Sequence, residues 1–328
     1  MKNSDKYTTK PLTTPLHPCT PSPLSPNTPA PLHPCTPLKD KLYRYTAANR
    51  QFRVFAVDST HSTQIARDLH DLSPLATLLM GRMLSAAALL SLDLKDKNSD
   101  LTLRVDSQNE LKGGVVIAGS EGNLRGYLFA PHIFYEDPAQ NLNLGPKLLP
   151  GTLSLMRNNP KKSPYTGMIE LKSGEIAEDL AWYYQVSEQI PSAVNLGVLI
   201  DPEARVRASG GFIIQQLPFA EAAVAELFID NLNACPNLSD LMDMGLSIPE
   251  ILARFIFKEL DFELTESRDI RYQCHCSKQR FADALRLLGK AELTEMLDGI
   301  SPVCHYCNRT YEFSTADLQA LISPGDHT

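Results

Sequence analysis

Four cysteines near the C-terminal end constrain this chain more than any other feature. Cys274 and Cys276 are separated by one residue, and Cys304 and Cys307, which follow after the spacer 277–303, are separated by two. Two close pairs of thiols, brought together by the segment between them, can supply four sulfur ligands to one tetrahedral ion. We therefore predict a single metal site whose ligands are Cys274, Cys276, Cys304 and Cys307.

Zinc, one ion per chain, suits this donor set best, although a one-iron site uses the same four thiolates. The first pair is closer than the usual spacing of two to four residues in structural zinc sites. Two thiols separated by one residue can also form a strained disulfide that is readily reduced. The pattern therefore fits a redox switch as well as a structural site. His275 and His305 adjoin ligands and are expected to stay outside the metal shell.

The cysteines lie in a segment, residues 266–328, that is expected to form a small metal-binding module. A helix with one apolar face is predicted at 281–288, and alternating Tyr311 and Phe313 predict a strand. Residues 314–317 have the form of a capping box that opens a last helix. About 60 residues with so few apolar side chains are marginal as an independent fold, so their folding should depend on the metal.

Residues 41–218 have the pattern of a larger α+β domain with a mostly antiparallel sheet and packed helices. Three short alternating segments at 101–105, 114–118 and 124–129 predict a β-meander. Helical segments over 62–94 are interrupted at Ser73-Pro74, where a second helix can begin. Strands are also expected at 52–57, 165–171, 194–200 and 211–216, and a helix at 176–189. Hairpins with segregated helices indicate the α+β class.

Two further segments flank these parts. Residues 219–265 carry short helical patterns, each too short to be stable alone, and are expected to form a metastable helical linker. Cys235 within it has no ligand partner at useful spacing and is expected to pack as an apolar side chain. Residues 1–40 hold 10 of the 24 prolines and are expected to be a disordered tail, in which nothing would hold Cys19 and Cys35 as metal ligands.

Composition excludes several classes of protein. The net charge of −7 carries no broad basic excess, so nucleic-acid binding is not expected. The longest apolar stretch, residues 75–94, is interrupted by polar residues, so no membrane span is expected. The N-terminus lacks a secretory pattern, and clustered reduced thiols indicate a cytoplasmic protein. A closed shell of four thiolates leaves no open coordination position for water, and no catalytic set is identifiable, so the chain is not expected to be an enzyme.

At these positions the chain resembles the thirty-three-kilodalton heat-shock chaperones, which are redox-regulated holdases. The resemblance rests on the cysteine spacing and on three segments: 165–169, 182–191 and 280–289. It extends over roughly 42–322, and the proline-rich segment 1–40 has no counterpart in it.

The resemblance implies an ATP-independent chaperone that is inactive while reduced and zinc-bound. Oxidation would pair Cys274 with Cys276 and Cys304 with Cys307, release the zinc, unfold the module and destabilise the linker. The exposed apolar surface would bind unfolding client proteins, often as a homodimer. The alternative is a zinc-ribbon module that binds RNA or a protein partner, with a purely structural zinc and basic side chains supplied by Lys278, Arg280, Arg286 and Arg309.

Overall fold

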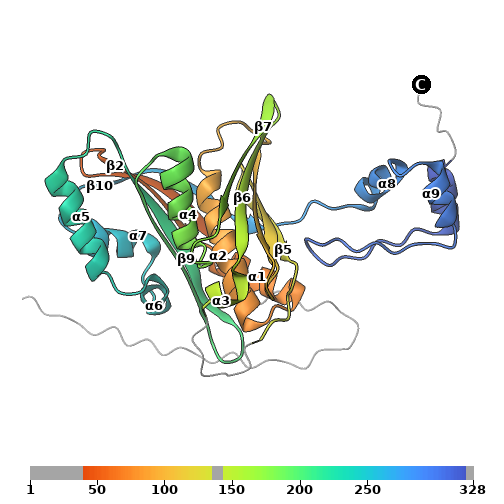
Figure 1. Cartoon of the computed structure of the whole chain (residues 1–328), viewed down its shortest axis with the longest axis horizontal. Helices are drawn as coiled ribbons and strands as arrows, with labels where there is room; N and C mark the ends of the chain where they lie inside the picture. The colour runs from red at the N-terminus through yellow and green to blue at the C-terminus, as the bar shows by residue number, and fades with distance from the viewer. Residues whose placement is uncertain (1–39, 135–142, 323–328) are drawn as a thin grey trace, which may run out of the picture. The chain divides into compact units, whose positions relative to one another are not determined.

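The computed structural model describes residues 40–134 and 143–322 (Figure 1). The expectations for the proline-rich segment, Cys19 and Cys35 among them, concern residues outside this range. The α+β class is confirmed, because antiparallel sheets and packed helices make up the described chain.

Two antiparallel sheets form the framework. The first has the order β10-β1-β2-β9-β8, and the second has the order β11-β5-β4-β3-β6-β7. Every pairing is antiparallel except β11 with β5, which is parallel. The strands of the first sheet are β1 (Lys41–Ala47), β2 (Phe52–Asp58), β8 (Ser192–Ile200), β9 (Val206–Gln216) and β10 (Phe262–Asp269); those of the second are β3 (Asp100–Ser107), β4 (Gly113–Gly119), β5 (Asn123–Leu128), β6 (Gly151–Asn159), β7 (Lys162–Glu170) and β11 (Arg271–Tyr272).

The larger core surrounds helix α2 (Pro74–Ser91), which packs against strands of both sheets. Ser73 caps this helix by accepting a hydrogen bond from the Ala76 amide at 3.4 Å, as the Ser-Pro pair predicts. By length and composition α2 is the one helix in the described chain that could cross a membrane, but 89% of its apolar window is buried inside the protein. This burial is that of a core helix. Around it lie α1 (Thr60–His70), α3 (Gly145–Leu148), α4 (Ala177–Tyr183) and the π-helix η1 (Tyr184–Glu188).

A second core lies on the other face of the first sheet, under four short helices. These are α5 (Ala222–Ala234), α6 (Leu238–Asp243), α7 (Ile248–Ile251) and the π-helix η2 (Leu252–Ile256). An aromatic group holds them to the sheet: the ring of Phe257 lies 5.8 Å from that of Phe228 and 5.2 Å from that of Phe262. Each helix therefore depends on the sheet for its stability, as expected of a short helix.

The C-terminal segment contains α8 (Lys278–Arg286), α9 (Lys290–Glu295) and α10 (Thr315–Ile322). Ser314 and Asp317 form the expected capping pair, with the Asp317 amide donating to Ser314 Oγ at 3.3 Å. The strand expected at 311–313 is wrong, because only isolated bridges join Ile300 to Phe313 and Val303 to Thr310. The boundary expected between the linker and the metal-binding module, after residue 265, lies inside strand β10 (Phe262–Asp269). The segment between the short helices and the cysteines therefore contains a strand.

Replacing Phe257 with Ala should loosen the helices on the second core more than the rest of the protein. Phe257 is 1% exposed, and removing a buried Phe costs about 3–5 kcal/mol. Urea unfolding followed by dye binding should reveal an early transition. The control Ile229→Ala, at a side chain on α5 that is 50% exposed, should change stability by less than about 1 kcal/mol. Equal effects of the two changes would contradict this packing.

Candidate metal centre

Two separate loops bring the four predicted cysteines together. Cys274 and Cys276 lie between β11 and α8, whereas Cys304 and Cys307 lie in the turn that the two isolated bridges enclose. All four sulfur atoms lie within 4.8 Å of one another. Each thiol is free, so no disulfide competes with a metal for these sulfurs.

The spacing of the sulfurs fits a tetrahedral ion. Cys274 Sγ lies 3.7 Å from Cys304 Sγ, and Cys276 Sγ lies 3.4 Å from Cys307 Sγ. Ligands about 2.3 Å from a tetrahedral metal are about 3.8 Å apart. A disulfide would instead require about 2.05 Å. The four cysteines could therefore hold one metal ion with little movement.

A tight backbone turn fixes the second pair. The Cys304 carbonyl accepts hydrogen bonds from the amides of Cys307 at 3.2 Å and Asn308 at 2.8 Å. Asn308 adopts a positive φ of 53°, a conformation that Asn tolerates better than most residues, and this closes the turn. The Arg309 carbonyl then accepts from the Cys304 amide at 2.9 Å. The turn thus brings the backbones of Cys304 and Cys307 close together.

The thiols of the cluster differ in how readily they ionise. Burial opposes ionisation of Cys276, but hydrogen bonds from Tyr311 and from the neighbouring thiols outweigh it and lower its pKa to about 7. The Tyr311 hydroxyl donates to Cys276 Sγ at 3.0 Å. Burial raises the pKa of Cys274 and of Cys307. Tyr311 thus favours the thiolate form of Cys276, whereas burial favours the neutral thiols of Cys274 and Cys307.

Tyr272 anchors the cysteine loops to the larger domain. Its hydroxyl lies 2.5 Å from the Gly126 carbonyl, 2.9 Å from the Tyr306 carbonyl and 3.0 Å from His70 Nε2. Burial lowers the pKa of His70, which keeps this imidazole neutral at neutral pH. A second link is the Asn308 side-chain amide, which donates to the Leu69 carbonyl at 2.6 Å. One hydroxyl thus joins β5, α1 and the turn that carries Cys304 and Cys307.

Aromatic rings extend this contact. The ring of Tyr127 stacks on His305 with centroids 5.3 Å apart and meets the edge of Tyr306 at 5.2 Å. The guanidinium of Arg125 lies 5.4 Å from the Tyr306 ring centre. His275 and His305 are exposed and do not belong to the group of sulfur ligands. The two imidazoles therefore lie outside the cluster.

Sequence reasoning did not identify Tyr272 or the role of Tyr311. Tyr311 was expected only as a strand residue, and its bond to Cys276 depends on the turn geometry. Tyr272 lies two residues before Cys274, but its partners Gly126 and His70 are distant in sequence. A tyrosine close to the first cysteine pair is only a weak indication of an anchoring role, because the partners of its buried hydroxyl become known only from the fold.

Two antiparallel sheets with packed helices, joined to a segment that gathers four free thiols, define an α+β protein with a thiol-rich centre able to hold a metal. The sequence model of the Hsp33 protein family matches residues 40–314. The chain is 36% identical over 288 residues to the 33 kDa chaperonin of Agathobacter rectalis, covering 87% of this chain and 100% of that protein. It is 39% identical to the 33 kDa chaperonin of Symbiobacterium thermophilum, covering 86% and 96%.

A solved structure is similar as well. The crystal structure of the 33 kDa chaperonin (heat shock protein 33 homolog) from Thermotoga maritima matches with a TM-score of 0.78 and 31% identity, over 86% of this chain and 97% of that one. The chain belongs to the Hsp33 family of chaperones. Membership implies that it binds unfolded client proteins, and the relatives bear the name of a chaperonin and not that of an enzyme.

Replacing Tyr311 with Phe should make Cys276 less acidic in the metal-free protein. Loss of a hydrogen bond to a charged sulfur costs about 1.5–3 kcal/mol, which should raise the pKa of Cys276 well above 7. Alkylation of Cys276 by iodoacetamide at pH 7 should slow about tenfold, as measured by peptide mapping. The control Tyr306→Phe should leave this rate within about twofold. An unchanged rate in Tyr311→Phe would show that the phenol does not stabilise the thiolate.

Replacing Tyr272 with Phe should loosen the cysteine loops and leave the sheets folded. The change leaves the Tyr306 carbonyl and His70 without their shared partner, at a cost of about 1–3 kcal/mol. Trypsin cleavage after the exposed Arg271 and Arg280 should accelerate about tenfold. The exposed control Tyr165→Phe should not change cleavage. Equal cleavage in both variants would contradict the anchoring role.

Proposed function

We propose that this chain is a redox-regulated, ATP-independent holdase, inactive while reduced and zinc-bound, that binds unfolding proteins after oxidation. The observation that carries the proposal is the single cluster of four sulfurs drawn from two loops that the segment 277–303 separates. Such a cluster can join the two loops in one redox state and release them in another.

The proposed ligands of one zinc ion are Cys274, Cys276, Cys304 and Cys307. When bound, zinc would keep these sulfurs as thiolates and link the two loops. The segment has a small core of its own, in which Ala282, Leu285, Leu293, Phe313 and Leu318 are buried and seven partly buried apolar side chains pack against them. Folding of residues 266–328 would therefore depend on the bound ion.

Oxidation would remove the ligands. Each pair of thiols would lose two electrons and two protons to form a disulfide, and a peroxide that accepts them would be reduced to water and the corresponding hydroxyl compound. We propose the pairs Cys274 with Cys276 and Cys304 with Cys307. A cavity of about 290 Å³ adjoins the sulfurs, so a small oxidant has access. Neither disulfide would connect the two loops, so cross-linking would not replace the lost metal.

The linker would transmit this change. The chain runs from η2 through β10 and β11 directly to Cys274, and the Tyr272 anchor lies between the linker and the cysteines. Losing a metal coupling of about 10 kcal/mol or more would exceed the stability of so small a module. Release of α5 to η2 (residues 222–256) would then uncover Phe52 and Phe262 on the first sheet, against which Phe228 and Phe257 pack. We propose that clients bind such surface in the cytoplasm, and that the active form is a homodimer.

Light scattering of a heat-unfolding client should test this function. The oxidised protein should suppress aggregation at near-equimolar amounts, and the reduced, zinc-loaded protein should not. Oxidation should release one zinc per chain, measured with a chromogenic chelator, and lower the mass by four hydrogens. The double change Cys304→Ser with Cys307→Ser should abolish oxidant-dependent activation, whereas the control Cys235→Ser should leave it intact.

Two outcomes would contradict the proposal. Oxidant-triggered suppression that survives in the Cys304→Ser, Cys307→Ser protein would remove the cluster from the switch. Inactivity of both redox forms, together with salt-dependent binding of RNA, would favour the zinc-ribbon alternative instead.

A further inference from the structure

The two sheets have four outer strands, and three of them carry features that hinder pairing with another chain. β10 has four charged residues among its eight, and β11 is only two residues long. β7 contains Pro164, which cannot donate a backbone hydrogen bond, and ends at the charged Glu170. Charge, proline and shortness are the usual protections of a sheet edge. The fourth outer strand, β8, has none of them.

Strand β8 is an open, uncharged edge. Its nine residues, Ser-Ala-Val-Asn-Leu-Gly-Val-Leu-Ile, include no charge and no proline. It pairs with β9 on one side, and on the other side no strand of the described chain pairs with it. All its residues except Leu196 are partly exposed. Half of its backbone N–H and C=O groups therefore point toward a position that another strand could occupy.

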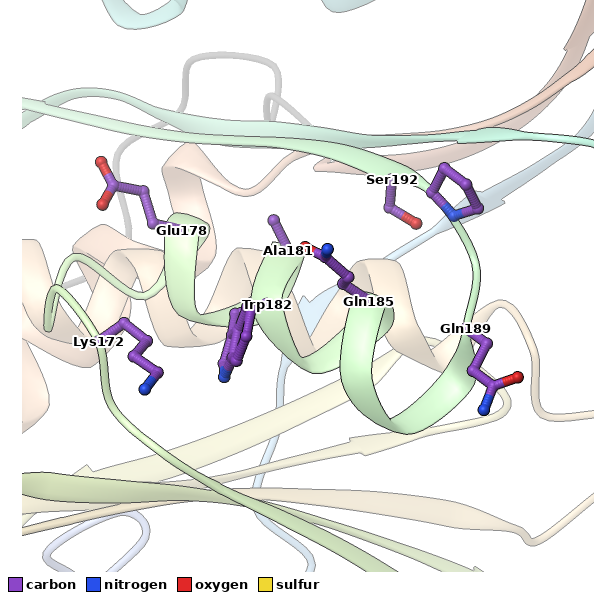
Figure 2. Close-up of a pocket in the computed structure, with 8 residues that line it drawn as sticks. Lys172, Glu178, Ala181, Trp182, Gln185, Gln189 and Ser192 are labelled. Atoms are coloured by element: carbon purple, nitrogen blue, oxygen red, sulfur yellow. The ribbon is translucent and has the colours of Figure 1, made fainter.

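A groove adjoins the beginning of this strand. Figure 2 shows one face of α4 and η1 facing the groove, with Lys172 and Glu178 toward one end and Ser192 toward the other. The cavity has a volume of about 740 Å³. Trp182, half-buried, lies in its wall with the Lys172 ammonium 5.2 Å from the ring centre, and the amides of Gln185 and Gln189 line the same face. The wall thus combines the ring of Trp182 with amides that can both donate and accept hydrogen bonds, and its charged groups are Lys172 and Glu178.

Helix α6 of the linker restricts the other face of β8. A Cβ atom placed on Gly197, at the middle of the strand, would lie 3.2 Å from both the backbone nitrogen and Cβ of Ser239. The beginning of α6 therefore rests directly on β8 in this state. Removing α6 with the linker would leave β8 accessible from the edge and from this face.

We infer that the open edge of β8 and the adjoining groove bind an extended, uncharged segment of an unfolded client by strand addition. The inference rests on the proposed chaperone function and assigns it a docking surface. Backbone hydrogen bonds to β8 do not depend on client sequence, and Trp182 packs against whichever apolar side chain enters the groove. The absence of charge on β8 favours apolar, β-branched segments. α6 limits access until the linker leaves.

The single tryptophan of the chain makes a direct test possible. The probe is a ten-residue peptide of alternating Thr and Val with a Lys at each end, which contains no tryptophan. Added to the oxidised protein, it should change Trp182 emission in a saturable manner, and binding to the reduced, zinc-loaded protein should be at least tenfold weaker. Asn195→Lys, which places a charge at the centre of the edge, should weaken binding at least tenfold and remove most suppression of client aggregation.

Two further variants control for misfolding and for general effects of charge. Leu264→Lys adds the same charge to the already charged strand β10 and should leave peptide affinity within twofold. Gln185→Arg, at an exposed helix position that cannot disturb the core, should weaken binding through the groove alone. Far-ultraviolet circular dichroism should be unchanged in all three variants.

Peptide affinity unchanged by both Asn195→Lys and Gln185→Arg would overturn the inference. So would an oxidised dimer that Asn195→Lys converts to monomer with peptide binding intact, because the edge would then serve a second copy of this chain. Suppression of aggregation by an oxidised protein that does not bind the peptide would refute the docking surface alone. Failure of the oxidised protein to suppress aggregation at all would refute the proposed function, whatever the peptide titration shows.

Discussion

Four sulfur atoms lie within 4.8 Å of one another in the C-terminal segment, and the proposed function rests on this arrangement. Neutral thiols at such distances gain only weak hydrogen bonds, and several thiolates there would repel one another unless a cation lay between them. The core that opposes such repulsion is small, with five buried apolar side chains and seven partly buried ones packed against them. Under the proposed function, metal binding to these sulfurs and their oxidation would each change the free energy of folding of this segment.

The other parts of the molecule differ in how much their stability depends on neighbouring elements. Helix α2 is buried between the two sheets, and the core around it contains none of the four cysteines. The helices from α5 to η2 are short and have exposed outer faces, so they rely on one face of the first sheet. Tyr272 and β10 connect these helices to the cysteine loops. Oxidation of the sulfurs would thus unfold the helices from α5 to η2 first. The core around α2 would stay folded and could serve as a scaffold for binding.

The sequence predicted the elements whose pattern is local. The break at Ser73-Pro74, the meander of β3 to β5 and the capping pair of Ser314 and Asp317 follow from short-range rules, and all are present. Strands β1, β6, β10 and β11 were missed. β10 and β11 depend on partners far away in sequence: β10, polar and exposed, pairs with β1, and the two-residue β11 pairs with β5. β1 and β6 form hairpins with the strands that follow them, so local pairing was available and their pattern was overlooked. The clustering of the four cysteines could be predicted from spacing alone, whereas the contacts of Tyr272 and Tyr311 depend on the folded loops.

Hydrogen exchange of the full chain, compared between the reduced, zinc-loaded and the oxidised states, tests the central claim most directly. The account predicts that amides of residues 274–313 and of α5 to η2 lose most of their protection on oxidation, whereas α2, β4 and β9 keep theirs. Retained protection in the linker after complete disulfide formation and zinc release would contradict the coupling between the sulfurs and the linker. Uniform loss of protection throughout the chain would contradict the persistence of a folded binding scaffold.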